Sequence, residues 1–143
     1  MVSSLMVNRV YMAHHFPAII TLAALFLYVL TGVAVAVGRV KYGIAAPATT
    51  GNDDFERVFR VQMNTQENLL IFLPALWLFS IYVSYYWAGL IGLVWLVGRS
   101  YYALSYSRSA AARSPGFAIS FLAFSVLAIG AGVGVVSQIL VGL

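Results

Sequence analysis

Residues 57–69 read RVFRVQMNTQENL and place several chemically capable side chains at the start of a long apolar run. On a helix with 100° per residue, four side chains point within about 80° of one another and form one polar stripe: Arg57, Arg60, Asn64 and Glu67. Arginine's planar fork suits bidentate contacts with carboxylates. An asparagine amide can orient the amide groups of a ligand. The stripe therefore predicts a pocket for a small, peptide-like anion.

A second group follows in residues 98–115. Arg99, Tyr102 and Tyr106 recur at intervals of three and four residues, so they share one helix face. Arg113 returns close to that face if the helix continues. The tyrosines offer hydroxyl groups and flat apolar surfaces. We expect the two groups to face each other or a neighbouring subunit.

Simpler interpretations are open for each group. The side chains of Arg57 and Arg108 can be explained as ones that only extend to the membrane interface. Glu67 can instead form an ion pair with an arginine that only stabilises the helix bundle. Tyr102 and Tyr106 can be ordinary aromatic residues at the membrane interface. Four polar side chains on one face exceed what one ion pair needs, and ionisable residues inside a membrane usually serve a function. The anion pocket is the favoured interpretation.

The composition indicates a membrane protein, because 62% of the residues are hydrophobic and only 8% are charged, against about 25% charged in a soluble domain. Residues 16–37 and 117–143 carry no charge, and each run reaches the roughly 20 residues that cross a bilayer. We expect the first run to be a retained helix and not a cleaved signal peptide.

The middle of the chain predicts two further helices. Residues 68–98 carry no charge but are too many for one ordinary span, and the aromatic cluster near 83–88 suggests an interfacial turn. Each half is too short to cross about 30 Å of hydrocarbon, so the neighbouring polar residues must enter the spans. The expected fold is one all-α domain over 1–143, a bundle of four transmembrane helices at roughly 14–38, 54–83, 86–110 and 115–141.

The basic residues predict the orientation. Most basic residues lie near the connection between helices 1 and 2 or the connection between helices 3 and 4: Arg39, Lys41, Arg57, Arg60, Arg99, Arg108 and Arg113. Only Arg9 lies toward the other side. The positive-inside rule then places both connections in the cytoplasm and both termini outside. Compactness and the lack of an evident retention tail favour a multi-pass protein of a bacterial inner membrane.

Several classes of function are excluded or disfavoured. The chain has no cysteine, so it has no disulfide, thiolate metal site or cysteine nucleophile. His14 and His15 have no metal-type ligands nearby in the sequence, and we expect no metal. The basic residues are not gathered on a soluble face, which disfavours nucleic acid as a partner.

Two segments carry a resemblance to a known family. FERVFRVQMNTQENLLIFLPALW (55–77) and GRSYYALSYSRSAAARSP (98–115) closely resemble the MAPEG superfamily, the membrane-associated proteins in eicosanoid and glutathione metabolism. Its members include microsomal glutathione transferases, leukotriene-forming synthases and the 5-lipoxygenase-activating protein. The resemblance implies a homotrimer of four-helix subunits in membrane lipid, with a glutathione site between neighbouring subunits.

The resemblance also implies roles for residues. The glutathione-binding positions it indicates are Arg39, Arg57, Arg60, Asn64, Glu67, Arg99, Tyr102 and Tyr106, with Arg39 reaching a ligand carboxylate from the adjacent subunit. Arg113 corresponds to a catalytic arginine that stabilises the glutathione thiolate. This chemistry is reasonable because a free thiol has a pKa of about 8.5 and only the thiolate attacks well, while a guanidinium keeps its proton and acts electrostatically.

The implied activity is a glutathione transferase that conjugates hydrophobic electrophiles from the bilayer, a detoxification reaction, with reduction of lipid hydroperoxides as a second activity. Asn68 stands where several relatives have tyrosine, and Val40 where leukotriene-forming enzymes tend to have arginine; both weaken an assignment as a leukotriene synthase. Two alternatives stay open: a non-catalytic lipid-binding scaffold like the lipoxygenase-activating member, and an ion or proton carrier that uses Glu67.

Overall fold

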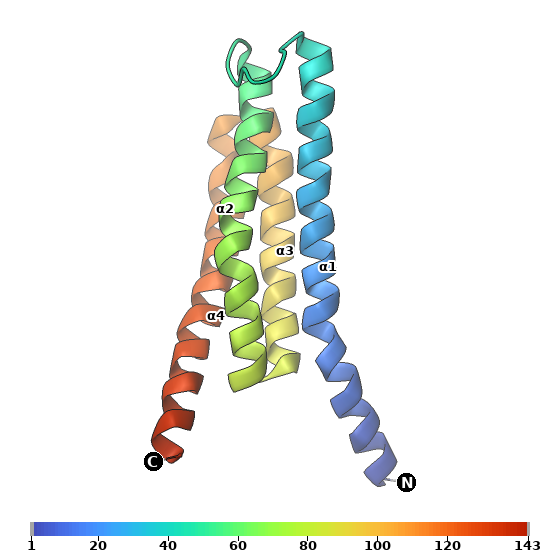
Figure 1. Cartoon of the computed structure of the whole chain (residues 1–143), viewed down its shortest axis with the longest axis vertical. Helices are drawn as coiled ribbons and strands as arrows, with labels where there is room; N and C mark the ends of the chain where they lie inside the picture. The colour runs from blue at the N-terminus through green and yellow to red at the C-terminus, as the bar shows by residue number, and fades with distance from the viewer. Residues whose placement is uncertain (1, 143) are drawn as a thin grey trace.

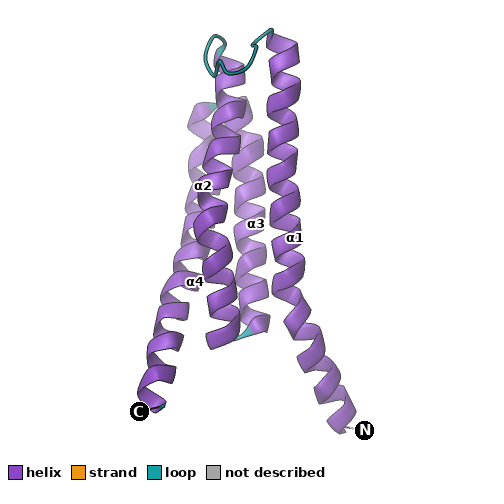
Figure 2. Ribbon diagram, viewed as in Figure 1, coloured by secondary structure: helices purple, strands orange, loops and turns teal. Residues whose placement is uncertain are grey.

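The protein is described by a computed structural model that covers residues 2–142, with side chains for 14–109 and 111–142. This part of the chain is entirely helical apart from its connections and contains no strand (Figure 2). The elements in chain order are α1 (Val2–Tyr42), α2 (Asp53–Tyr82), α3 (Tyr85–Arg108), the short 3-10 helix η1 (Ala110–Arg113) and α4 (Ser114–Val141). The predicted all-helical class is confirmed.

The four long helices form an elongated bundle with α2 and α3 at its centre (Figure 1). Each central helix packs against the other and against both α1 and α4. The α1–α2 and α3–α4 connections lie at one end, and the α2–α3 turn lies at the opposite end, toward which both termini extend (Figure 1). Among the described residues, His14–Tyr42 and Ala111–Val141 are long and apolar enough to cross a membrane.

The ends of the first two helices follow from local signals. α1 extends past the expected 14–38 at both ends, because no glycine or proline precedes Pro17 and the helix ends only where Gly43 adopts a positive φ of 68°. At the start of α2, the Asn52 side chain accepts hydrogen bonds from the backbone N–H groups of Asp54 and Phe55. Acidic residues in the first turn of α2 also favour its start.

The joint between α3 and α4 differs from a continuous helix. α3 ends at Arg108, Ser109 is extended (φ −154°, ψ 130°), and η1 then leads directly into α4. α4 folds back against α3 at Gly116, where an added Cβ would lie 2.5 Å from the backbone N of Tyr102 and 2.8 Å from the carbonyl O of Gly98. Only glycine permits this approach, which fixes the start of α4 beside α3.

An apolar core fills the middle of the bundle. Phe72 of α2 stacks on Trp95 of α3 with ring centroids 3.9 Å apart and an interplanar angle of 4°. Leu76 and Leu127 are fully buried in the same cluster, together with Ile20 of α1. Because α3 runs from the α2–α3 turn toward the other end, the polar residues that follow Trp95 lie just beyond this core.

Candidate functional site

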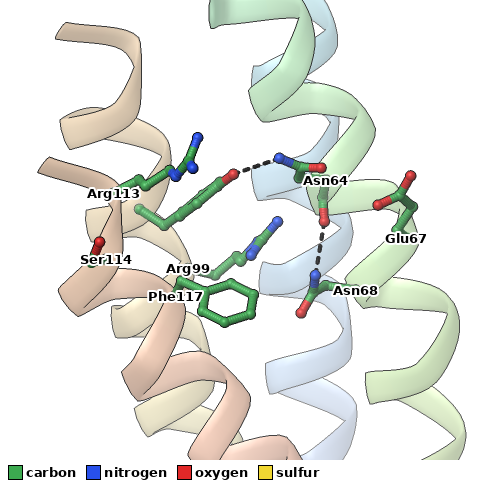
Figure 3. Close-up of a pocket in the computed structure, with 8 residues that line it drawn as sticks. Asn64, Glu67, Asn68, Arg99, Arg113, Ser114 and Phe117 are labelled. Carbon is green, nitrogen blue, oxygen red and sulfur yellow. Dashed lines mark hydrogen bonds between the residues drawn. The ribbon is translucent and has the colours of Figure 1, made fainter. Parts of the chain in front are cut away.

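A cavity of about 400 Å³ opens between α2, α3 and the start of α4 (Figure 3). All of its lining residues except Phe117 carry a polar side-chain group; they are Asn64, Glu67, Asn68, Arg99, Tyr102, Arg113, Ser114 and Phe117. Five of these are site residues predicted from the sequence, and they come from α2, α3 and η1. The structure therefore brings the two polar groups of the sequence together.

The α2 wall is built from two asparagines and a glutamate. Asn64 donates a hydrogen bond from Nδ2 to the hydroxyl of Tyr102 at 2.6 Å, which ties α2 to α3. One turn later, Asn68 donates from Nδ2 to the carbonyl O of Asn64 at 3.0 Å (Figure 3). Glu67 is exposed at the outer edge of this wall. The wall thus presents amide groups and one carboxylate to a ligand.

Arg99 is the most unusual residue of the cavity. Its side chain is fully buried, and its guanidinium carbon lies 4.2 Å from the centre of the Tyr102 ring. Within the described residues, none of its three guanidinium nitrogens has a hydrogen-bond acceptor. A buried donor without a partner is costly, especially when it is charged. An acceptor supplied by a ligand would remove that cost.

Arg113 reaches the cavity from η1 and not from α3. Its Nη1 donates a hydrogen bond to the hydroxyl of Tyr106 at 3.2 Å, and its guanidinium carbon lies 5.2 Å from the centre of that ring. The sequence interpretation needed a continuous helix to return Arg113 to the face of Tyr106. The extended Ser109 and the turn of η1 achieve this instead, and they leave the guanidinium exposed at the cavity edge.

The remaining predicted arginines of α2 lie around a second, smaller hollow. Arg57, Arg60 and Tyr106 line a cavity of about 220 Å³ together with Asp53 and Glu56. The polar stripe of α2 is therefore divided between two cavities. Tyr106 of α3 lines the smaller cavity, and Tyr102 lines the larger one with Asn64 and Glu67.

The ion pair expected as a simpler role for Glu67 is not formed within the described part of the chain. There the single ion pair joins Arg57 to Asp54, which lies three residues earlier on the same helix. The Glu67 carboxylate is left free for a ligand or a neighbouring subunit.

Arg39 lies away from both cavities in its own subunit. Its Nη1 donates to the carbonyl O of Ala48 at 2.8 Å, and its guanidinium carbon is 5.1 Å from the centre of the Phe55 ring. These contacts hold the α1–α2 connection against the end of the bundle. The contact with an adjacent subunit that the sequence suggested stays a prediction.

Sequence reasoning did not include Asn68, Ser114 and Phe117 in the site. Asn68 lies four residues after Asn64, so helical spacing alone could have added it to the stripe. Ser114 and Phe117 begin α4, and no periodicity links them to α2 or α3. Their place depends on the fold of the α3–α4 joint.

The arrangement suits an anionic organic ligand. Arg99 and Arg113 outnumber the single carboxylate of Glu67 on the cavity wall, and the asparagines and Ser114 add polar groups that bind amides. Among the described residues, no group of three or more histidine or acidic side chains could hold a metal ion. A small peptide-like anion fits these properties, because its carboxylates can pair with arginine and its peptide bonds with the asparagines.

Known proteins resemble this chain over most of its length. The chain is 48% identical over 123 residues to an uncharacterised protein of Synechocystis sp. (86% of this chain and 90% of the relative). It is 37% identical over 102 residues to human microsomal glutathione S-transferase 2 (71% and 69%) and 34% identical over 125 residues to leukotriene C4 synthase of Mus musculus (87% and 83%). The model of the MAPEG family matches residues 17–133, and this chain belongs to that family.

Proposed function

We propose that this protein is a membrane-bound glutathione transferase that conjugates the glutathione thiolate to hydrophobic electrophiles. The observation that carries the proposal is the Arg113–Tyr106 pair at the edge of a cavity whose other walls carry Arg99 and the amides of Asn64 and Asn68. The relatives named as glutathione S-transferase and leukotriene C4 synthase support the same class of enzyme.

The chemistry assigns different tasks to the two sides of the site. The glutathione backbone is held by five residues: Arg60, Asn64, Glu67, Tyr102 and Tyr106. Arg113 lies beside the sulfur. The guanidinium stabilises the thiolate electrostatically and keeps its own proton, while the thiol proton passes to solvent. The sulfur then forms a bond to an electrophilic carbon of the substrate, while the bond to the leaving group breaks and that group departs with its electron pair. The same thiolate can attack the O–O bond of a lipid hydroperoxide, which releases the lipid alcohol and leaves a glutathione sulfenic acid; a second glutathione then gives the disulfide and water, so peroxidase activity is a second expected reaction.

We further propose that the working unit is a homotrimer in which each subunit crosses the membrane four times. Arg60 and Glu67 are exposed on the outer face of α2, and charged groups are costly against lipid. A neighbouring subunit that covers this face would complete the glutathione site. Both connections would face the cytoplasm of a bacterial cell, where the basic residues are favoured.

The direct test uses purified protein in nanodiscs. Glutathione binding is measured by calorimetry, and conjugation is followed with the chromogenic electrophile chlorodinitrobenzene. We expect saturable binding and turnover. Absence of binding at millimolar glutathione would exclude the transferase function and leave the lipid-binding scaffold as the better account.

A further inference from the structure

A groove far from the glutathione cavity lies where α4 separates from the end of α2. Its volume is about 800 Å³, and it is open at the surface beside the α2–α3 turn. Tyr82 and Val83 form one wall, and the last turns of α4 form the other. The volume lies in the range of about 300–1,000 Å³ that is typical of small-molecule pockets. The proposed glutathione chemistry does not use this groove.

Two glycines fix the point at which α4 leaves α2. A Cβ added at Gly130 would lie 2.5 Å from Cε2 of the Phe79 ring, and one added at Gly134 would lie 2.9 Å from the carbonyl O of Tyr82. α2 ends at Tyr82, whereas α4 continues to Val141, about 10 Å farther at about 1.5 Å per residue. The last two turns of α4 therefore extend past the α2–α3 turn (Figure 1), and the groove is the wedge beside them.

The α2–α3 turn indicates the level of the groove in the membrane. Tyr86 and Trp87, at the start of α3, are 52% and 57% exposed, and such aromatic side chains gather where the hydrocarbon meets the headgroups. The headgroup region adds about 5–8 Å on each side of the hydrocarbon. Ser137 and Gln138 lie about one helical turn, or about 5 Å, beyond Gly134. These two residues are therefore at the depth of the lipid glycerol esters, and the part of the groove before Gly134 is at the depth of the acyl chains.

The polar side chains of the groove have no partner in the described part of the chain. Ser120 and Ser125 of α4 each donate a hydrogen bond to a carbonyl O of their own helix. Ser137 and Gln138 line the groove, and neither side chain forms such a bond with another described residue. The described lining residues carry no charge. The groove thus offers neutral hydrogen-bonding groups at its outer end and an apolar surface at its inner end.

We propose that this groove binds one phospholipid without net charge from the leaflet opposite the glutathione site. The ester carbonyl oxygens of the lipid accept hydrogen bonds from the Gln138 amide and the Ser137 hydroxyl. One acyl chain follows Val83 and Val133 and supplies the contact that α2 no longer gives to α4. An anionic phospholipid or a fatty acid is disfavoured, because the described lining offers no cation to its charge. This inference rests on the proposed crossing of the membrane and goes beyond the glutathione chemistry.

The test is native mass spectrometry of the full-length protein released from nanodiscs. The nanodiscs contain equal parts of dioleoylphosphatidylethanolamine, which has no net charge, and dioleoylphosphatidylglycerol, which is anionic. We expect one phosphatidylethanolamine per subunit to stay bound to the wild type. Val133→Trp, which fills the groove with an apolar ring, should remove this lipid. Val136→Trp, which places the same ring at an exposed position of α4 outside the groove, is the matched control and should retain it.

Polar substitutions test the hydrogen bonds separately from the shape of the groove. The double variant Ser137→Ala/Gln138→Leu should lower the occupancy of phosphatidylethanolamine about tenfold, because two neutral hydrogen bonds to the lipid are lost. Gln138→Lys adds a cation at the same depth and should shift the bound lipid toward phosphatidylglycerol. An unchanged occupancy in the double variant would mean that water alone satisfies the two side chains, which would overturn the inference.

Two further outcomes would also overturn it. One is a wild type that retains both lipids in proportion to their abundance, or equal lipid retention by Val133→Trp and Val136→Trp. The other is a loss of subunits from the complex in Val133→Trp but not in Val136→Trp, which would show that a second copy of this chain occupies the groove. Neither outcome affects the proposed function, which glutathione binding tests independently.

Discussion

The middle of the bundle and its cavity are built from the same two helices but are held together differently. In the middle, Phe72 and Trp95 stack face to face and are fully buried among apolar neighbours. One turn further along α3, Arg99 is equally buried but has no acceptor in the described structure. Among the described residues, one neutral donor of the first layer, the Trp95 indole N–H, lacks an acceptor, whereas in the second layer all three nitrogens of a charged guanidinium lack one. The difference indicates that the apolar layer supplies rigidity and the cavity stores unsatisfied polar groups for binding.

The largest expected effect on folding comes from the apolar layer. Trp95→Ala removes the ring that stacks on Phe72 and should destabilise the protein by about 3 kcal/mol, because packing is the main force between helices in a membrane. Thermal unfolding in nanodiscs measures the loss. Trp95→Phe, which keeps an aromatic ring, should lose much less. Equal stability of Trp95→Ala and the wild type would show that this layer does not hold the bundle together.

Arg113→Leu, in contrast to Trp95→Ala, should lower the activity and leave the stability nearly unchanged. The conjugation rate should fall by about 100-fold or more, equivalent to about 3 kcal/mol of transition-state stabilisation, because the thiolate loses its cation. The unfolding temperature should change little, since the side chain is exposed. Steady-state kinetics with chlorodinitrobenzene measure the effect, and Arg108→Leu serves as the exposed-arginine control. An unchanged rate would mean that a different residue stabilises the sulfur.

Tyr102→Phe should have a smaller effect on the stability of the bundle. It removes the acceptor of the 2.6 Å hydrogen bond from Asn64 and should cost about 1 kcal/mol. A double-mutant cycle with Asn64→Ala isolates the coupling between the two side chains. We expect a coupling energy of about 1 kcal/mol in unfolding experiments. Fully additive effects would indicate that the bond does not contribute to joining α2 and α3.

The smallest expected effect is at the exposed end of α2. Asp54→Asn breaks the ion pair with Arg57, in which the Asp54 side chain is 56% exposed. Solvent screens such pairs, so the change in unfolding free energy should be below about 1 kcal/mol and should shrink further at high salt. Unfolding measurements at low and high salt check this. A large loss that is insensitive to salt would assign the aspartate a structural role beyond the pair.

The helical class and the polar stripe of α2 could be predicted from the sequence for clear physical reasons. Uncharged runs of sufficient length specify membrane-type helices. Helical periodicity places Asn64 and Glu67 on neighbouring positions of one face and does the same for Arg99 and Tyr102. These predictions depend only on local geometry, which a sequence pattern contains.

Other features depend on how distant segments meet. Arg113 returns to Tyr106 through the extended Ser109 and not through a continued α3, and no periodic pattern predicts such a break. Ser114 enters the cavity because Gly116 lets α4 approach α3 closely. The missing acceptors of Arg99 can be recognised only when every neighbour of its side chain is known.

In the proposed function, the cavity holds glutathione as a thiolate beside Arg113. The most direct measurement is a titration of the nanodisc-embedded protein with glutathione, monitored by the ultraviolet absorbance of the thiolate at neutral pH. We predict a saturable thiolate signal in the wild type, and glutathione binding without that signal in Arg113→Leu. Glutathione that binds to the wild type only as the neutral thiol, or an equal thiolate signal in both proteins, would contradict the account.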